Sequence, residues 1–414
     1  MLILQQFKIK RKTFPIPHSP FPIKRASRLG LFVTTIDYRS DSPLHSTFLI
    51  PRSPGKAKTQ NMMTENLPDI QRRNGAIFED IAEVMVPVSF GNDALAIEAA
   101  HQGVAIADLS HWGLLKISDN DRLRFLHNQS TNDFQTLKPG QGCDTVFVTS
   151  TARTIELVTA YVTEDAVLVL ISPNRLQEII KWLDRYLFPM DRVILTDLSN
   201  QSFIFSIIGS ESDIILSKLG VPLPIGDNYA SHQLLTVNDI EVRIAVGSGL
   251  GLPGYTLIVA ASDGAKLWAA LTEAGAIPMG DGVWQQLRII QGRPFPNSEL
   301  TEDYNPLEAG LWQTISFNKG CYIGQETIAR LNTYKGVKQR LWGIRLQAPA
   351  QPGTIITVDD DKVGKLTSVT ETNSGYFGLA YIRTKAGGIG LKVKVGEIEG
   401  EIVAVPFLTH EYYS

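Results

Sequence analysis

The sequence changes character near Lys338, and this change limits the possible folds more than any other feature of the chain. From there to the end, short strand-like runs alternate with turns rich in Gly and Asp. Short strands separated by turn signals are typical of a barrel or sandwich. Residues 338–414 are therefore expected to form a small all-β domain. Its strands are expected at Leu341–Leu346, Thr354–Val358, Lys365–Thr370, Phe377–Tyr381 and Ile402–Val405.

Residues 75–335 carry a mixed pattern of helices and strands instead. The clearest element is a helix predicted over Asn174–Leu187, which has one apolar face, Asn174 as a cap and Pro189 just beyond its end. Other helices are expected at 92–102, 121–127, 265–274 and 281–291. Strand-like runs occur at 114–117, 145–149, 167–171, 193–195, 203–208, 242–246 and 255–259. This mixture of helices and strands predicts an α+β protein. Because 414 residues exceed what one hydrophobic core usually organises, more than one domain is expected.

Residues 1–60 are predicted to be a transit peptide or a disordered segment. They contain eleven Lys and Arg against two acids, and their early prolines (residues 15, 17, 20 and 22) would break the amphipathic helix of a mitochondrial presequence. This composition favours import into the chloroplast stroma, with the mitochondrial matrix as the alternative. A basic tail without any targeting role is the remaining interpretation.

Beyond residue 60 the chain is acidic, with 28 Lys and Arg against 40 Asp and Glu. An acidic body disfavours extended contact with phosphates, so no direct nucleic-acid partner is expected. No apolar run approaches the ~18 residues that a membrane span needs. The two cysteines, Cys143 and Cys321, belong to no metal-ligand pattern, whereas iron–sulfur clusters normally take four thiolates. Any iron–sulfur chemistry would therefore concern another protein's cluster.

The most unusual local sequence is Asn318-Lys319-Gly320-Cys321-Tyr322-Ile323-Gly324-Gln325-Glu326. Its glycines allow positive φ angles or a close approach of backbone to a ligand. Cys321 precedes a predicted helix start and lies two residues from Lys319, where a thiolate would be stabilised. The same amides and the lysine would also suit a carboxylate or phosphate. The alternative is that Cys321 is a small buried residue that only packs.

The run Lys319-Gly320-Cys321-Tyr322-x-Gly324-Gln325-Glu326 resembles the signature of the YgfZ-type folate-binding proteins. These are relatives of the glycine-cleavage T-protein that are linked to iron–sulfur protein maintenance and, through it, to tRNA modification. The segments 107–113, 121–134, 287–288 and 305–311 resemble other parts of the aminomethyltransferase superfamily, and the resemblance covers about residues 75–400. It implies an aminomethyltransferase-like folate-binding fold, with several domains around a central channel and a C-terminal β-barrel at 338–414.

This resemblance also implies a site for tetrahydrofolate or a one-carbon derivative. A pterin ring needs aromatic and apolar walls, and the glutamate tail needs cations. The catalytic candidates are Lys319, Cys321 and Glu156. The cofactor-binding candidates are Arg288, Glu308, Trp312, Gly320, Tyr322, Gly324, Gln325, Glu326 and Arg330, with Trp284 as a further wall. The alternatives are core packing for the aromatic residues, an ion pair for Arg288 and a turn cap for Glu308.

Two departures from the T-protein pattern argue against glycine cleavage. T-proteins carry an Ile-Asp-Asp run where this chain has Ile155-Glu156-Leu157, and a later glutamate where this chain has Thr256. Positioning the reacting amine in one-carbon transfer needs a carboxylate at hydrogen-bond distance. Of these carboxylates only Glu156 remains.

The sequence therefore predicts a tetrahydrofolate-dependent accessory protein for iron–sulfur cluster assembly or repair in an organelle. An aminomethyl transferase with Glu156 as its base, and a non-catalytic folate-binding scaffold, are the alternatives. The implied partners are the folate and iron–sulfur client or assembly proteins, with no membrane. Cys321→Ala and Lys319→Ala are expected to leave folding intact and to abolish rescue of a bacterium that lacks its own homologue.

Overall fold

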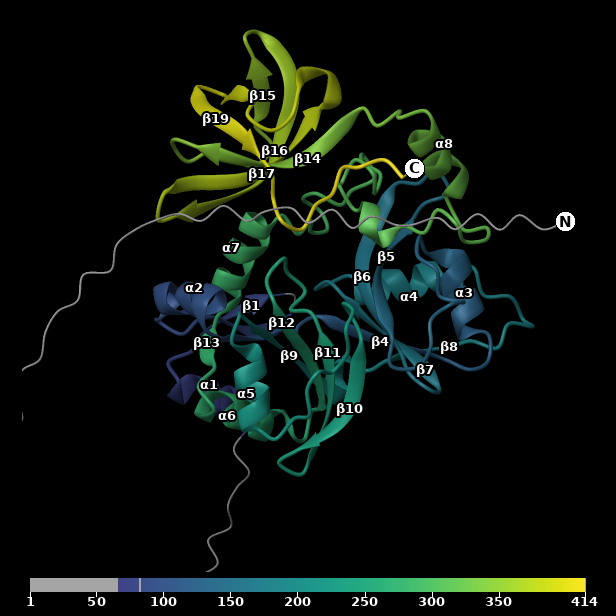
Figure 1. The fold of residues 1–414 in the computed structure, drawn as a ribbon, viewed down its shortest axis with the longest axis vertical. Helices are drawn as coiled ribbons and strands as arrows, with labels where there is room; N and C mark the ends of the chain where they lie inside the picture. The colour runs from purple at the N-terminus through teal and green to yellow at the C-terminus, as the bar shows by residue number, and fades with distance from the viewer. Residues whose placement is uncertain (1–65, 82, 414) are drawn as a thin grey trace, which may run out of the picture. The chain divides into compact units, whose positions relative to one another are not determined.

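The computed structural model of the chain describes residues 66–81 and 83–413, and the predicted transit peptide at 1–60 lies outside them. Within the described residues, no helix is both long and apolar enough to span a bilayer. These residues form an α+β structure with two open sheets, a hairpin of β1 (Ile77–Ile81) and β2 (Val84–Ser89), and a closed C-terminal barrel, as Figure 1 shows.

The larger open sheet has six strands in the order β10-β11-β12-β9-β3-β13. Its strands are β3 (Ala105–Asp108), β9 (Ser202–Ile208), β10 (His232–Val237), β11 (Ile240–Val246), β12 (Gly254–Ala260) and β13 (Ile277–Met279). Alternate side chains of these strands pack against α1 (Leu67–Arg73), α5 (Ser212–Lys218) and α6 (Gly264–Glu273), in a core that contains the fully buried Trp268. One face of this sheet is therefore closed by helices.

The smaller open sheet has five strands in the order β5-β6-β7-β4-β8. Its strands are β4 (Gly113–Ser118), β5 (Gly142–Val148), β6 (Thr154–Val162), β7 (Ala166–Ile171) and β8 (Ile194–Asp197). Helices α3 (Arg122–Gln129) and α4 (Leu176–Asp184) cover one face, where Phe125 and Ile179 pack against Phe147 and Val169. The strand β5 is an edge strand, and its free edge pairs through Phe147 with Ser130 in the segment that follows α3.

The faces of the two sheets that these helices leave open meet in a shared core. Leu114 and Leu170 of the smaller sheet lie in one cluster with Ile204 and Ile258 of the larger sheet. Helices α2 (Asp93–Gln102) and α7 (Asp281–Gln291) contribute to the same cluster. Because side chains alternate along a strand, every second residue of β5, β6, β9 and β12 points into this central region.

The C-terminal domain is a closed six-stranded barrel in the order β14-β17-β16-β15-β18-β19, which confirms the predicted barrel. Its strands are β14 (Gln339–Leu346), β15 (Ile355–Val358), β16 (Asp361–Thr372), β17 (Gly375–Arg383), β18 (Lys392–Val395) and β19 (Ile398–Val403). Helix α7 contacts β16 and β17 and so links the barrel to the rest of the fold, as Figure 1 shows. The remaining elements are α8 (Gln325–Thr333) and three 3-10 turns, η1 (Ser199–Gln201), η2 (Trp312–Thr314) and η3 (Thr384–Ala386).

The helix with the clearest sequence pattern is shorter in the structure than predicted. The helix expected over Asn174–Leu187 begins at Leu176 and ends at Asp184. Asn174 does not cap it, because this residue has a φ of 61° and the helix has no side-chain cap. Arg175 turns back instead, and its guanidinium donates to the Ile155 carbonyl over 3.0 Å.

Candidate functional site

The ammonium group of Lys319 is buried at the C-terminal end of α3. It donates to the carbonyl oxygens of His127, Ser130 (2.8 Å) and Asn132 (2.6 Å). An ammonium has three protons, so all of its donors are used. Burial lowers the pKa of Lys319 to about 7. Lys319 thus fixes its own segment to α3 by satisfying carbonyls that a helix end leaves unpaired.

Cys321 is exposed, two residues after Lys319. Helix α8 begins only at Gln325, so the thiol lies ahead of the helix and not in its first turn. In this structure Lys319 has no free proton to offer a thiolate. The structure therefore brings these two predicted site residues into one loop without a direct interaction between their side-chain groups.

The remaining motif residues divide into an inner and an outer set. Tyr322 is buried beneath Lys319, whose Nζ lies 4.7 Å from the ring centroid. Gly324 has a φ of +81°, and a Cβ there would come within 2.9 Å of the Thr149 carbonyl oxygen, so this position requires glycine. Gly320 is exposed, as are Glu326 and Arg330 on α8, while Gln325 is half-buried.

The C-terminal tail packs on the segment that carries the motif. Tyr412 meets the ring of Trp312 edge-on at 5.0 Å, and Tyr413 stacks on Phe317 at 5.1 Å. The backbone amide of Tyr413 also donates to Asn332 of α8. Trp312, a predicted pterin wall, is thus packed against the tail. This tail gave no local sequence signal, because its contacts join residues about 80–100 positions apart.

Arg288 lies in a buried network that joins α7 to the barrel. Its guanidinium donates to Glu299 (3.2 Å) and to the Ser368 hydroxyl on β16 (3.3 Å), and it lies 5.1 Å from the centroid of the Phe295 ring. The Ser368 hydroxyl in turn donates to Glu299 over 2.6 Å. This is the ion-paired arrangement that the sequence left open for Arg288. Trp284, the further predicted wall, is packed edge-on against Trp112 in the shared core.

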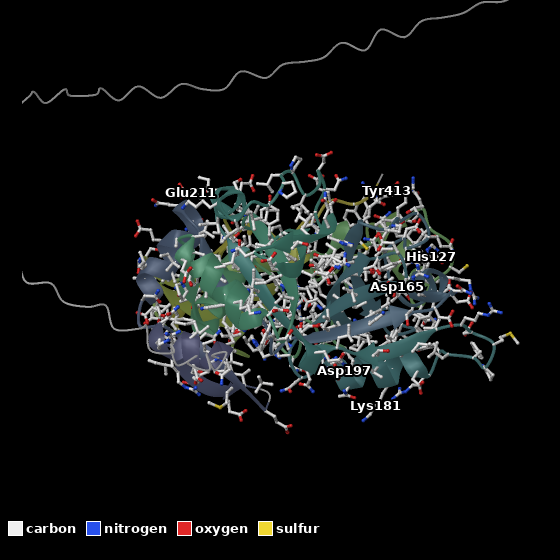
Figure 2. All side chains as sticks on the ribbon, turned by 90° about the horizontal axis from the view of Figure 1, so that it is seen from below. His127, Asp165, Lys181, Asp197, Glu211 and Tyr413 are labelled. Carbon is white, nitrogen blue, oxygen red and sulfur yellow. The ribbon has the colours of Figure 1, made fainter. Side chains whose placement is uncertain are left out.

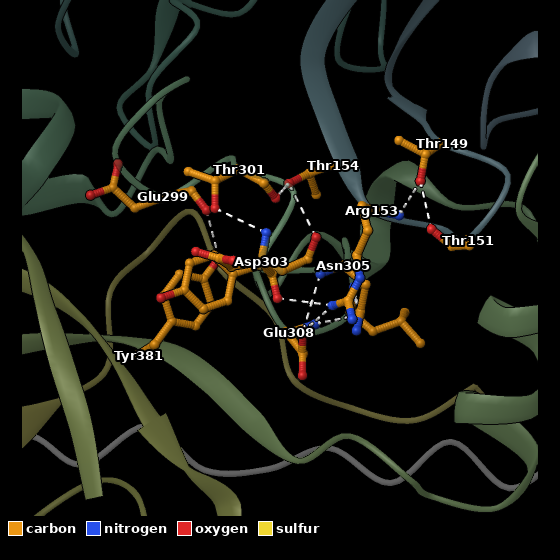
Figure 3. Close-up of polar contacts among 12 residues, drawn as sticks. Thr149, Thr151, Arg153, Thr154, Glu299, Thr301, Asp303, Asn305, Glu308 and Tyr381 are labelled. Carbon is orange, nitrogen blue, oxygen red and sulfur yellow. Dashed lines mark hydrogen bonds and ion pairs between the residues drawn. The ribbon is translucent and has the colours of Figure 1, made fainter. Parts of the chain in front are cut away.

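Glu308 lies in the turn that precedes η2, and Figure 3 shows it together with Asn305 and Arg153. Its carboxylate accepts from the Asn305 amide over 3.1 Å, and the Asn305 side chain accepts from the Glu308 amide over 3.0 Å. Arg153 approaches the same carboxylate at 4.0 Å. Burial raises the pKa of Glu308. These contacts match the turn-capping interpretation.

Glu156 is fully buried on β6 and faces α4. It accepts from the Ser172 hydroxyl over 2.8 Å and from Arg175 over 3.3 Å. Burial raises the pKa of Glu156 to about 7, against the lowering effects of Ser172 and Arg175. Because side chains alternate along a strand, Glu156 and the adjacent Leu157 point to opposite faces of the sheet. Glu156 therefore does not face the central region between the sheets.

Leu157 and Thr256 do face the central region. Leu157 packs in an apolar cluster with Tyr304 and Tyr381. The Thr256 hydroxyl donates to the Gly247 carbonyl oxygen over 2.8 Å. Neither position offers a carboxylate to a bound molecule, as the sequence indicated.

A buried polar cluster in the central region was missed by the sequence analysis. Asp144 on β5 accepts through Oδ1 from the Thr159 hydroxyl (2.6 Å) and the Tyr229 hydroxyl (3.0 Å). Burial raises the pKa of Asp144, while the nearby Arg293 lowers it. Among the described residues, no hydrogen bond reaches the second carboxylate oxygen of Asp144.

Arg293 is only 3% exposed and follows directly after α7. Its guanidinium donates to the Gly249 carbonyl oxygen over 2.8 Å and lies 5.6 Å from Trp112 and 5.3 Å from Phe407, measured to the ring centroids. No carboxylate of the described residues lies within ion-pair distance of it. Arg293 and Asp144 are therefore two buried charges with unused hydrogen-bonding capacity in one region.

Asn132 connects this central cluster to the motif. Its side-chain amide donates to the Asp144 carbonyl oxygen over 2.8 Å, and its own carbonyl accepts from Lys319. Burial raises the pKa of the Cys143 thiol, which is next to Asp144, and the nearby charge of Lys319 lowers it. The central cluster and the Lys319 loop are thus neighbouring parts of one region, and we take this region as the candidate site.

Comparison with known proteins agrees with this fold. Residues 67–319 match the family model described as the GCVT N-terminal domain. The Arabidopsis thaliana protein named "Putative transferase At1g60990, chloroplastic" is 47% identical over 335 residues, which cover 80% of this chain and 78% of that protein. The aminomethyltransferase of Halalkalibacterium halodurans is 27% identical over 354 residues, covering 82% of this chain and 96% of that protein.

The fold is also that of a solved T-protein. The crystal structure of glycine cleavage system aminomethyltransferase T from Bartonella henselae superposes with a TM-score of 0.73 at 17% identity, covering 84% of this chain and 99% of that chain. This similarity agrees with the α+β architecture predicted from the sequence. The chain belongs to the aminomethyltransferase (GCVT) family, whose members typically bind tetrahydrofolate.

Proposed function

We propose that this protein binds tetrahydrofolate between its two open sheets and supports the assembly or repair of iron–sulfur proteins. The observation that carries the folate site is Arg293, a buried guanidinium with one hydrogen bond and no ion pair among the described residues. A buried charge is costly unless it is paired. A ligand that brings acceptor atoms to Arg293 would offset this cost.

The chemistry of a reduced pterin fits the groups present. One edge of the pterin carries N–H groups, which would donate hydrogen bonds to the free oxygen of Asp144. The carbonyl oxygen of the pterin would accept a hydrogen bond from Arg293. Trp112 and Phe407 supply aromatic surface next to the guanidinium. When bound, the folate would supply or accept a one-carbon unit, and these residues would bind and orient its ring.

Two features favour an accessory role over glycine cleavage. Leu157 and Thr256 leave the central face without the carboxylates that the T-protein pattern carries. The exposed Cys321 lies in a motif that resembles that of the YgfZ-type proteins, and its thiol is open to a client protein. The chloroplastic name of the Arabidopsis relative supports import into the same compartment.

A second candidate function is tetrahydrofolate-dependent one-carbon transfer. Asp144 favours it, because this carboxylate lies on the same sheet face as Leu157 and has one unused oxygen. The base of such a reaction would then be Asp144, since Glu156 faces α4. Release of formaldehyde or methylene-tetrahydrofolate from a methylamine donor would support transfer, and its absence across donors would favour the accessory role.

Rescue of a bacterium lacking its YgfZ-type protein tests the accessory role. We expect the chain to restore the activity of iron–sulfur enzymes, and both Cys321→Ala and Arg293→Gln to reduce that activity to the level of the empty strain. Arg185→Gln, which changes an exposed arginine at the end of α4, is the matched control and should rescue fully. Full rescue by both site variants would refute the proposed function.

A further inference from the structure

The motif loop is fixed to α3 at both ends, and Cys321 lies between the two attachments. Lys319 is attached through its ammonium group, and the Ile323 amide donates to the Asn128 carbonyl oxygen over 3.1 Å. The loop therefore crosses the end of α3 with little freedom. In the view of Figure 2, His127 lies on the same side as Tyr413, whose ring stacks on Phe317 just before the motif.

His127 lies directly under this loop. A Cβ placed on Gly320 would lie 3.4 Å from Nε2 of His127, so the imidazole edge faces the backbone next to Cys321. The residue is 4% exposed, and Nε2 has no hydrogen-bond partner among the described residues. This imidazole nitrogen therefore has unused hydrogen-bonding capacity next to the loop that carries the exposed Cys321.

Asp133 fixes the orientation of this imidazole. Its Oδ1 lies 3.0 Å from Nδ1 of His127 and also accepts from the Gln135 amide over 2.9 Å. A carboxylate at Nδ1 keeps the proton there, which leaves a lone pair on Nε2. The arrangement of carboxylate, imidazole and thiol follows the general logic of an activated nucleophile.

We infer that His127, oriented by Asp133, accepts the proton of the Cys321 thiol and so generates a nucleophilic thiolate. The thiolate then attacks an electrophilic carbon, the leaving group departs with the bonding electrons, and the proton stays on Nε2. No hydrogen bond joins the two side chains in this structure, but such contacts are often long before a substrate binds. Asp133 is the positioning residue of this pair.

The electrostatics around His127 agree with this role. Burial lowers the pKa of His127, the ammonium of Lys319 lowers it further, and Asp133 opposes both effects. Lys319 and Asp133 are the charged groups that act on the imidazole, and Asp133 and Cys143 in turn act on the pKa of Lys319. These effects together favour the neutral imidazole, which is the form that carries a lone pair on Nε2.

Alkylation of the full chain by iodoacetamide tests this inference. The rate at Cys321 is followed between pH 5 and 10 by mass spectrometry of the tryptic peptide 320–330, which excludes Cys143. We expect the rate at pH 7 to drop about tenfold or more in His127→Asn, because this variant lacks the proton acceptor. Asp133→Asn should lower the alkylation rate as well. Because Asp133 is part-exposed, this second variant tests the inference if His127→Asn does not fold.

Two outcomes would overturn the inference. One is an unchanged rate and pH profile in both variants, and the other is a loss of reactivity in Lys319→Met alone. The inference rests on the role proposed for Cys321, but the assay contains no folate. A failure here therefore leaves folate binding at Arg293 untouched, and a failure of folate binding leaves the thiol chemistry untouched.

Discussion

Replacing Glu299 by alanine is expected to lower the free energy of unfolding by about 3–5 kcal/mol, because it removes one partner of a buried ion pair. Glu299 is fully buried and accepts from Arg288, from the Ser368 hydroxyl and from the Phe295 amide (3.0 Å). Its loss leaves the Arg288 charge unpaired between α7 and the barrel.

Urea unfolding of the full chain measures this effect. Glu302→Ala, which removes an exposed carboxylate three residues along the same loop, is the matched control and should change the free energy by less than about 0.5 kcal/mol. A loss below about 1 kcal/mol for Glu299→Ala would contradict the assignment of this network as the link between α7 and the barrel.

Replacing Lys319 by methionine is expected to destabilise the fold by about 2–4 kcal/mol, since three carbonyl oxygens at the end of α3 lose their donor. This differs from the expectation drawn from the sequence, which treated Lys319→Ala as neutral for folding. The reason is that the ammonium is a structural cap as well as part of the motif.

The effect of Lys319 depends on pH with a defined sign. Its pKa in the folded protein is about 7, against 10.5 in a free side chain, so the unfolded state binds more protons between these values. The unfolding free energy of the wild type therefore rises with pH from about 7 to about 10.5 relative to that of Lys319→Met. Lys181→Met on α4 is the exposed control. Equal pH slopes for the wild type and Lys319→Met would contradict the burial of this charge.

The elements with strong local patterns could be predicted from the sequence. Helix α7 was predicted at its observed bounds, and the barrel followed from the repeated short strands and turns. The Lys319–Glu326 motif was found because its glycines and cysteine form an unusual local run. In each case the determining residues are neighbours along the chain.

The central cluster could not be predicted in the same way. Asp144 and Arg293 are about 150 positions apart and meet only because β5 and the end of α7 border the same region. The sheet face to which the Glu156 side chain points could not be predicted either, because β6 is buried on both faces and shows no polar–apolar alternation. Only the pairing of β6 with β5 shows that Asp144, and not Glu156, faces the space between the sheets.

Titration of the full chain with tetrahydrofolate tests the central claim most directly. We expect saturable binding, a loss of affinity of about 10–100-fold in Arg293→Gln and in Asp144→Asn from one lost charge-assisted hydrogen bond, and unchanged affinity in Arg185→Gln. Calorimetry gives the affinities, and quenching of tryptophan fluorescence, to which Trp112 beside Arg293 contributes, reports the same event. No binding of any reduced folate, or equal binding by all three variants, would contradict a folate site between the two sheets.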